Sequence, residues 1–356
     1  MPSKRDTRID FARGLALLII FTDHVRGNPL SSFTPVSLSY TSMAEVFIFL
    51  SGYVCGLTYR RTLTDQGFYS CQRKALRRSM QIYGAHIATS LLVMSVLLIW
   101  AKLVDPLDVS MFASFATFQA DMWQFIANVC VLKQKVSDFD ILPIYLSLLP
   151  VLPAMLYLET CNKIVLPLIS IVTYMFVTVA GMHFQWPWVF NPLAWQLLFV
   201  FGISLSRLRG KKKLRFKYSA AAVVTSFVLL ESLVFAKYMT SDSLPFSSRP
   251  NLEPIRVIHF LCFAILIRHV FQQFDFSALR CARPVLLCGR NSLITYCAGA
   301  VMANLFTLAG NRFSCNWFWP VVVNVIGWLG CVGVAWGYER SSMGLRGTRG
   351  IRKKAK

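Results

Sequence analysis

The chain has 356 residues, of which 55% are hydrophobic and only 15% are charged, and its mean hydropathy is +0.53. Soluble globular proteins carry about 25% charged residues, so this composition excludes a soluble enzyme and indicates a membrane protein. A net charge of +21 would suggest nucleic-acid binding in a soluble chain. Here the basic residues stand between apolar runs, which is typical of membrane topology and not of a polyanion-binding surface.

Apolar runs that approach the ~20 residues needed to cross a bilayer recur from one end of the chain to the other. They predict an all-α polytopic membrane bundle of about ten transmembrane helices. We expect one membrane-embedded domain over residues 1–345 and a basic cytoplasmic tail over 346–356. A cleavable signal peptide is not expected, because no small-residue cleavage site follows the first apolar run. The predicted spans lie near residues 9–27, 40–59, 81–103, 141–159, 163–182, 191–207, 217–236, 255–271, 288–309 and 316–337.

The basic residues predict the orientation of these spans. If the spans alternate in direction, 29 of the 37 Lys and Arg residues lie on the side that holds both termini and 8 lie on the other side. Cytoplasmic connections are enriched in Lys and Arg, so both termini should be cytoplasmic. The longest outer connection, 104–140, is rich in Phe and should lie on or dip into the membrane. The ten cysteines lack the spacing of metal ligands, and no metal site is predicted.

The first predicted span carries more ionisable residues than a lipid-facing helix tolerates: Asp10, Arg13, Asp23 and His24. Arg13 and His24 are eleven positions apart, which is about three helical turns, so both face the same way and lie ~16 Å apart along the helix axis. Arg13 should lie near the cytoplasmic mouth and His24 near the outer end. Either residue alone could be an interfacial or capping residue, but the pair on one face indicates a functional site.

A carboxylate beside His24 would raise the basicity of the imidazole and fix its tautomer, as a general base requires. Glu45, near the outer end of the second span, should lie at a depth close to that of His24. Asp23 is the other candidate for this role, although neighbouring residues on a helix diverge by about 100°. Gly52 and Gly56 in the second span predict close helix packing.

Other chemistry-bearing residues have two interpretations each. The basic run before the third span is either an orientation signal or a polyphosphate-binding site, because Arg guanidinium groups bind phosphate in a bidentate manner. It comprises Arg73, Lys74, Arg77 and Arg78. Polar residues inside the later spans could also be functional or could bond across helices; these are His86, Gln196, Glu231, His259, Asn291 and Asn304.

Six sequence blocks carry a resemblance to a known family: RIDFARGLALLIIFTDHV, AEVFIFLSGY, RKALRR, DILPIYLSLLP, FNPLAWQLLFVFG and LCGRNSLITYC, in that order. With these blocks the chain resembles the glucan biosynthesis protein C family, membrane acyltransferases that succinylate osmoregulated periplasmic glucans and are close to acyltransferase family three. The resemblance spans nearly the whole chain. It includes the hallmark of the superfamily, Arg or Lys, ten residues, then His, at Arg13 and His24.

The resemblance implies an integral O-acyltransferase of the bacterial inner membrane. It would move a succinyl or acetyl group from cytosolic acyl-coenzyme A to a hydroxyl of a periplasmic or surface glycan. No cofactor would be bound, acyl-coenzyme A would be the co-substrate, and the partners would be this donor, the glycan and membrane lipid. His24 would be the general base, oriented by Glu45 or Asp23. The residues implied to hold the phosphates and the pantetheine arm of the donor are Arg13, Arg73, Lys74, Arg77 and Arg78.

Two other functions compete with this interpretation. A transporter or flippase for a glycan or its precursor would also contain buried ionisable residues, but the sequence lacks the paired short helices that recur in the two halves of many carriers. A structural membrane scaffold would have polar residues that satisfy one another. Glycan analysis separates the three: an enzyme changes an acyl mass, an exporter changes the amount of glycan, and a scaffold changes neither.

Overall fold

The computed structural model describes residues 6–134, 136, 141–179, 190–208, 220–239, 247–274, 276, 278–313 and 318–354, without the side chains of residues 220, 272, 313 and 343–354. These residues form helices and their connections, with no strand among them. The prediction of an all-α fold is therefore confirmed for this part of the chain.

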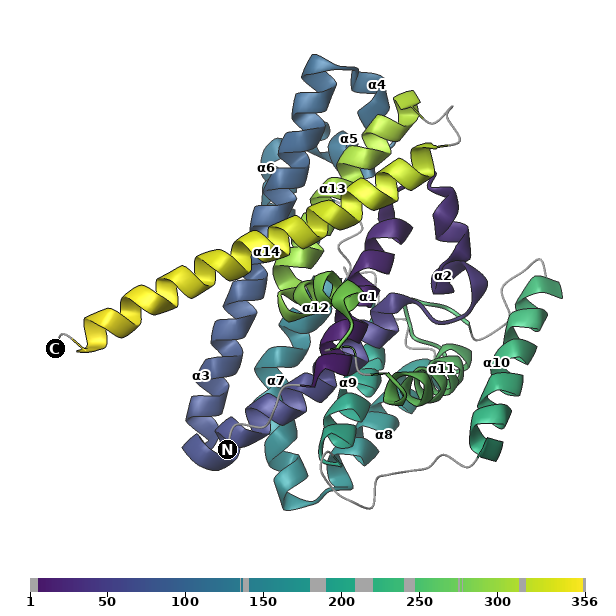
Figure 1. Cartoon of the computed structure of the whole chain (residues 1–356), viewed down its shortest axis with the longest axis vertical. Coiled ribbons are helices and arrows are strands. Elements are labelled where there is room, and N and C mark those ends of the chain that lie inside the picture. The colour runs from purple at the N-terminus through teal and green to yellow at the C-terminus, as the bar shows by residue number, and fades with distance from the viewer. Residues whose placement is uncertain are drawn as a thin grey trace. The chain divides into compact units, whose positions relative to one another are not determined.

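The α-helices follow one another along the chain as labelled in Figure 1. Each of the ten predicted spans overlaps a helix, two of them on the long helix α3. The bounds are α1 Thr7–His24, α2 Pro35–Leu38, α3 Met43–Leu103, α4 Pro106–Val109, α5 Ala113–Ala120, α6 Met122–Cys130, α7 Ile141–Cys161, α8 Val165–Val179, α9 Pro192–Ser206, α10 Ala220–Met239, α11 Pro254–Gln272, α12 Arg283–Arg290, α13 Ser292–Phe313 and α14 Trp319–Lys354. Short 3-10 turns lie at Pro29–Phe33 and Arg280–Ala282.

Within the described residues, six helices are long and apolar enough to cross a membrane: α3, α7, α10, α11, α13 and α14. The helices α8 and α9 are apolar but shorter, and α1 carries the ionisable residues of the first predicted span. The protein is thus a helical membrane protein by length and composition. The count of about ten spans remains a prediction.

Helix α3 bends back on itself at Gly67, where φ is 79°. The Lys74 ammonium donates a hydrogen bond to the Thr62 hydroxyl at 2.7 Å, although twelve positions of a straight helix extend ~18 Å. Glycine adopts a positive φ without the steric cost that a side chain imposes. Close to Gly67, the two helical parts of α3 therefore lie side by side, and the predicted spans 40–59 and 81–103 fall on different parts of this kinked helix.

The chain divides into two compact units, each built from separate stretches of sequence. The first unit comprises residues 1–32, 88–116 and 275–356, and the second comprises 33–87 and 117–274. Helix α3 begins in the second unit and ends in the first. The predicted single domain over 1–345 remains a prediction, and each unit is described below by itself.

In the second unit, α3 and α9 are in backbone contact. A methyl group placed on Gly52 would overlap the carbonyl of Phe199, and one placed on Gly56 would overlap the Ser206 hydroxyl. Helix α9 lies in the core, where Trp195 is fully buried. The predicted close approach at Gly52 and Gly56 is thereby confirmed.

In the first unit, α1 crosses α12 at a pair of glycines. A methyl group on Gly14 would overlap the carbonyl of Val285, and one on Gly289 would overlap the carbonyl of Asp10. Small residues that allow such contact are the usual basis of helix packing in membranes. The start of α1, including Asp10 and Arg13, is therefore held directly against α12.

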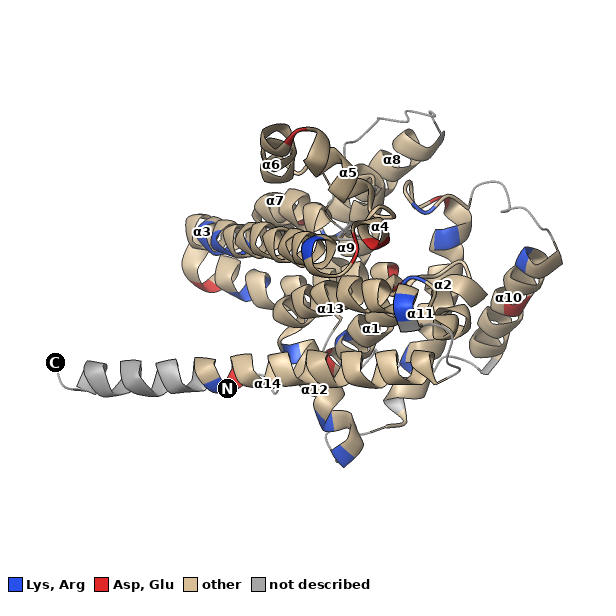
Figure 2. Ribbon diagram, turned by 90° about the horizontal axis from the view of Figure 1, so that it is seen from above, with Lys and Arg blue, Asp and Glu red and all other residues tan. Residues whose placement is uncertain are grey.

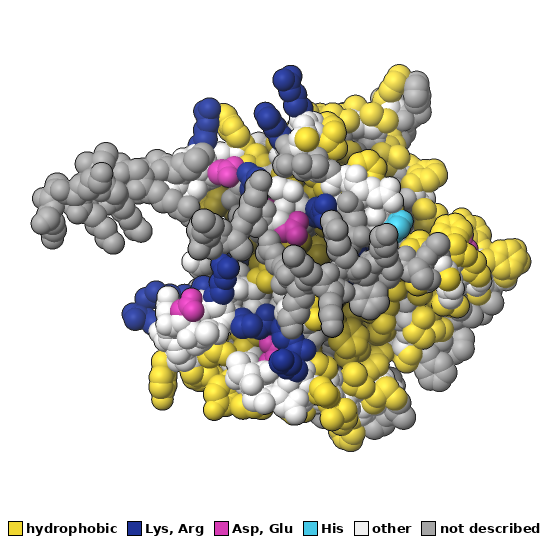
Figure 3. All heavy atoms as spheres, turned by 60° about the horizontal axis from the view of Figure 1, so that its bottom comes forward, with side chains coloured by type: hydrophobic (Ala, Val, Ile, Leu, Met, Phe, Trp, Pro, Cys, Tyr) yellow, Lys and Arg dark blue, Asp and Glu magenta, His cyan; other side chains and the backbone are white. Residues whose placement is uncertain are grey.

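Most helices carry few charged residues along their length (Figure 2), and many of their apolar side chains are exposed. They also cover much of the face drawn in Figure 3. A soluble monomer rarely exposes a contiguous apolar surface of this kind, whereas lipid covers it without cost. On α10 the exposed residues include Val224, Phe227, Val228, Leu229 and Phe235, and on α14 they include Val321, Val325, Ile326 and Leu329.

The predicted basic tail is continuous with the last helix. Helix α14 has 36 residues, so at 1.5 Å per residue it is ~54 Å long, compared with a hydrocarbon core of ~30 Å. The backbone of the tail is helical as far as Lys354, and its last two residues lie outside the described residues.

Candidate active site

Helix α1 carries the first pair of predicted site residues. Its N-cap is Asp6, whose carboxylate accepts a hydrogen bond from the Arg8 amide at 3.1 Å. The helix then runs without interruption to His24. Arg13 and His24 therefore lie on one helix, three turns apart, as the sequence predicts.

The tautomer of His24 is set by its own helix. Its Nδ1 lies 2.5 Å from the carbonyl oxygen of Ile20, one turn earlier. A carbonyl can only accept, so Nδ1 carries the hydrogen, and in the neutral ring the lone pair is then on Nε2. This is the arrangement that a general base needs. The i−4 carbonyl was a local signal that the sequence interpretation missed.

A buried polar network surrounds the end of α1 next to His24. Thr22 donates to the side-chain oxygen of Asn324 at 2.7 Å, and Asn28 donates to the carbonyl of Thr22 at 3.1 Å. Asn324 in turn donates to the Asn28 oxygen at 3.1 Å, and the Trp328 indole donates to the carbonyl of Leu18 at 3.2 Å. Asn28, Asn324 and Thr22 are buried. They hold the turns on both sides of His24 against α14.

The other end of the predicted path meets the junction of α12 and α13. The Arg13 guanidinium donates to the Ser292 hydroxyl at 2.6 Å, and the carboxylate of Asp10 lies 3.8 Å from the Arg290 guanidinium. Asp10 is buried and Arg13 is half-buried. The fold thus brings the first and the last of the six sequence blocks together. Ser292 and Arg290 were not predicted as site residues, because no local pattern links them to α1.

Glu45 lies in the second unit and has a different set of partners. Its carboxylate accepts hydrogen bonds from the Arg256 guanidinium, at 3.0 Å from Nε and 2.6 Å from Nη2, and from the amide of Ser42 at 2.9 Å. The Ser42 hydroxyl donates to the same carboxylate. Asp23 lies beside His24 in the first unit and is half-buried. The orienting role of Glu45 or Asp23 toward His24 remains a prediction.

The basic run of α3 divides into two faces. Arg73 and Arg77 are exposed, whereas Lys74 and Arg78 are half-buried. Lys74 lies 5.0 Å from the centre of the Tyr59 ring in addition to its bond to Thr62. Two of the four predicted phosphate-binding residues therefore point to solvent. All four belong to the second unit, and Arg13 belongs to the first.

The connection after His24 is tied to the start of the predicted outer connection. The Arg26 guanidinium donates to the carbonyl of Met111 at 3.0 Å and lies 5.1 Å from the centre of the Phe112 ring. Nearby, the indole of Trp100 bonds to the carboxylate of Asp108, and this bond, followed by those of Arg312, holds the pKa of Asp108 below its usual value. This arrangement secures the segment next to His24.

One known family matches the chain over nearly its whole length. A family model described as OpgC protein matches residues 5–343. The chain belongs to the OpgC family. Comparisons with curated proteins and with solved structures give no match. The family match covers segments of both units and all eight predicted site residues, and it confirms the resemblance found in the sequence.

Membership of the OpgC family, together with the apolar helices, makes the chain a membrane protein of glucan modification and indicates a transferase that acts on glucan. Within this OpgC-family chain, α1 contributes three of the predicted site residues, Arg13, Asp23 and His24, and one helix holds Arg13 and His24 in a fixed relation. The other predicted residues come from the second unit, where Glu45 and the basic run lie on α3.

Proposed function

We propose that this OpgC-family protein transfers a succinyl or acetyl group from cytosolic acyl-coenzyme A to a hydroxyl of a periplasmic or surface glycan. The protein lies in the bacterial inner membrane with both termini cytoplasmic, as the distribution of Lys and Arg predicts. The family match supports the class of substrate and the transferase activity. The geometry of α1 supports the use of a single base and a separate donor-binding residue.

The reaction needs one proton transfer and one displacement at the thioester. The Nε2 of His24 takes the proton of the acceptor hydroxyl, and the hydroxyl oxygen attacks the thioester carbonyl carbon. The carbon–sulfur bond then breaks, the ester forms, and the proton passes from His24 to the leaving thiolate. General base catalysis of this kind contributes about 10²–10⁴-fold to the rate.

The donor is held on the basic side of the protein. Arg13 contacts the donor at the cytoplasmic end of α1, and the exposed Arg73 and Arg77 bind its phosphates. The half-buried Lys74 and Arg78 add positive charge from the other face of α3. Arginine suits this role because its planar guanidinium group binds phosphate oxygens in pairs. The pantetheine arm of the donor would span the ~16 Å along α1 between Arg13 and His24.

The observation that carries this proposal is the bond between His24 Nδ1 and the carbonyl of Ile20. A histidine that only capped a helix could use either ring nitrogen. In this contact Nδ1 must donate, because the carbonyl can only accept, and in the neutral ring the lone pair is then on Nε2. Nε2 is therefore the nitrogen that can accept a proton.

The test is acyl transfer by purified protein in proteoliposomes, with acyl-coenzyme A inside and glucan outside. We expect His24→Ala and His24→Gln to lower the transfer rate by about 10²–10⁴-fold, with unchanged expression and thermal unfolding. His269→Ala, near the end of α11, is the matched control and should retain the wild-type rate. Transfer by both His24 variants within a few-fold of wild type would show that His24 is structural and that another group is the base.

A further inference from the structure

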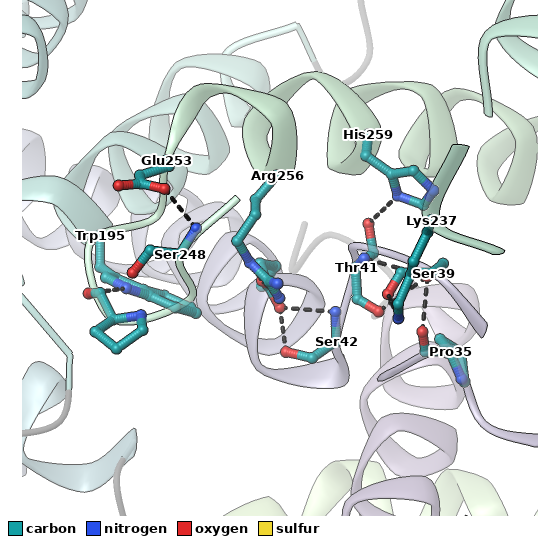
Figure 4. A network of polar contacts seen from close by, with 12 residues as sticks. Pro35, Ser39, Thr41, Ser42, Trp195, Lys237, Ser248, Glu253, Arg256 and His259 are labelled. Carbon is teal, nitrogen blue, oxygen red and sulfur yellow. Dashed lines mark hydrogen bonds and ion pairs between the residues drawn. The ribbon is translucent and has the colours of Figure 1, made fainter. Parts of the chain in front are cut away.

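A second buried polar network lies in the second unit, where α10 ends and α3 and α11 begin (Figure 4). None of its members takes part in the reaction steps proposed above, although Glu45 is one of the two residues predicted to orient His24. We call it the α3–α11 network, and it comprises Thr41, Ser42, Glu45, Lys237, Arg256 and His259.

One positive charge of this network is neutralised inside it. The guanidinium of Arg256 makes two hydrogen bonds to one oxygen of Glu45, and Glu45 is completely buried. Ser42 bonds to the other oxygen through its amide and hydroxyl. The pair of Arg256 and Glu45 is therefore electrically neutral, and the carboxylate has no capacity left for a second cation.

A second positive charge has no counter-charge among the described residues. The ammonium of Lys237 donates to the carbonyls of Ser37 at 2.9 Å and Ser39 at 3.2 Å, and it lies 5.6 Å from the centre of the Tyr40 ring. Among the residues that the structure describes, no carboxylate forms an ion pair with it. Lys237 is half-buried at the end of an apolar helix. The α3–α11 network thus carries a net charge of one positive unit when His259 is neutral.

Two polar atoms beside this charge are buried and lack a hydrogen-bond partner within the described part of the chain. They are the Nε2 of His259 and the hydroxyl of Tyr40. The rings of the two residues meet edge to face, with centroids 6.2 Å apart. The other ring nitrogen of His259 is occupied, at 2.6 Å from the Thr41 hydroxyl. Buried polar atoms in native proteins nearly always have a partner, so this pair indicates a group that binds here.

We propose that the α3–α11 network binds one carboxylate group of a substrate. A carboxylate supplies the single negative charge that balances Lys237. It accepts hydrogen bonds from the Lys237 ammonium and the Tyr40 hydroxyl. It also accepts one from the Nε2 of His259, which carries the hydrogen when Thr41 donates to Nδ1. This inference rests on the proposed function for its two sources of carboxylate. One is the far end of a dicarboxylic acyl group, and the other is an acidic group on the glycan acceptor.

The test measures binding without any transfer. The full chain in lipid nanodiscs is equilibrated with radiolabelled monomethyl succinate or with its neutral counterpart dimethyl succinate, and separately with glucuronic acid or neutral glucose. We expect one of the two acids to bind at least ~10-fold more tightly than its neutral counterpart, because hydrogen bonds to charged groups are strong. The acid that shows the preference identifies the source, acyl donor or glycan.

The variants separate binding from folding. Lys237→Met should abolish the preference for the acid, and Lys237→Arg should retain most of it. Tyr40→Phe removes only a hydroxyl and should weaken binding of the acid by a few-fold. It provides a second measurement if Lys237→Met does not fold. Lys102→Met, at the exposed end of α3, is the matched control and should bind as wild type does.

The inference is overturned if neither acid is preferred by the wild-type protein, or if a preference survives both Lys237→Met and Tyr40→Phe. Its failure is distinguishable from failure of the proposed function. His24→Ala should bind the preferred acid normally, because the α3–α11 network does not include His24. If the wild-type protein binds the acid but shows no acyl transfer, the result supports the carboxylate site and refutes the proposed acyltransferase activity.

Discussion

The buried ion pair between Arg256 and Glu45 should be the most costly polar contact to break in the second unit. Glu45 has no exposed surface and the Arg256 side chain is 9% exposed. Removing one partner leaves the other charge buried, which typically costs about 3–5 kcal/mol. We therefore expect Arg256→Met and Glu45→Gln each to lower the free energy of unfolding by about that amount, since Met retains much of the apolar length of Arg.

The double variant distinguishes a coupled pair from two independent losses. Replacing both partners leaves no unpaired charge. The double variant, Arg256→Met together with Glu45→Gln, should therefore lose less free energy of unfolding than the sum of the two single losses, by about 0.5–3 kcal/mol. The assay is equilibrium unfolding in mixed micelles titrated with a denaturing detergent and followed by tryptophan fluorescence. Arg312→Met is the control, because Arg312 and Asp105 are 42% and 33% exposed, and solvent screens such a pair so that its loss should change stability little. Single losses below about 1 kcal/mol, or strictly additive losses, would refute the reasoning.

Three further predictions test orientation, packing and acid sensitivity. In single-cysteine variants in spheroplasts, an impermeant thiol reagent should label the exposed Cys130 and leave the exposed Cys161 and Cys281 unlabelled; the opposite pattern would invert the orientation. Gly289→Ala should separate α1 from α12 and lower the thermal unfolding temperature by several degrees. Gly333→Ala is the control and should leave this temperature unchanged, because the space around Gly333 is open. Equal effects of the two substitutions would contradict the close crossing of α1 and α12. The pKa of Asp108 is depressed, so the stability that its carboxylate contributes is present above pH ~4 and is lost as the pH falls. Between pH 5 and pH 3, acid unfolding should therefore show a smaller loss of stability in Asp108→Asn than in wild type, by up to about 1 kcal/mol. Equal losses would show that the carboxylate contributes nothing.

The sequence predicts what is local and misses what is distant along the chain. The continuity of α1 through Arg13 and His24 followed from residue spacing, and the contact at Gly52 followed from the absence of a side chain. The partner of Glu45 could not be predicted, because Arg256 lies 211 positions away and had been counted only as an orientation signal. Hydrophobic patterns give the depth of a residue in the membrane, but they do not say which helix is its neighbour.

The basic run shows the same limit at shorter range. Its charges predicted a loop on the cytoplasmic side, and the structure continues α3 through them, with a reversal at Gly67. Once the chain turns there, Lys74 faces Thr62, and the four basic residues no longer form one surface. A single backbone dihedral angle thus divides a set that looks uniform in the sequence.

The discontinuous first unit constrains how the protein is synthesised. Asn324 and Trp328, which hold the end of α1 around His24, leave the ribosome long after α1 does, because Asn324 is 302 positions beyond its partner Thr22. A nascent chain that has reached residue 274 already contains every segment of the second unit but lacks α12, α13 and α14. The first helix therefore stays incompletely packed until about 300 further residues have been synthesised. We expect chains that stop before residue 324 to be inactive for this reason, even when the second unit has assembled.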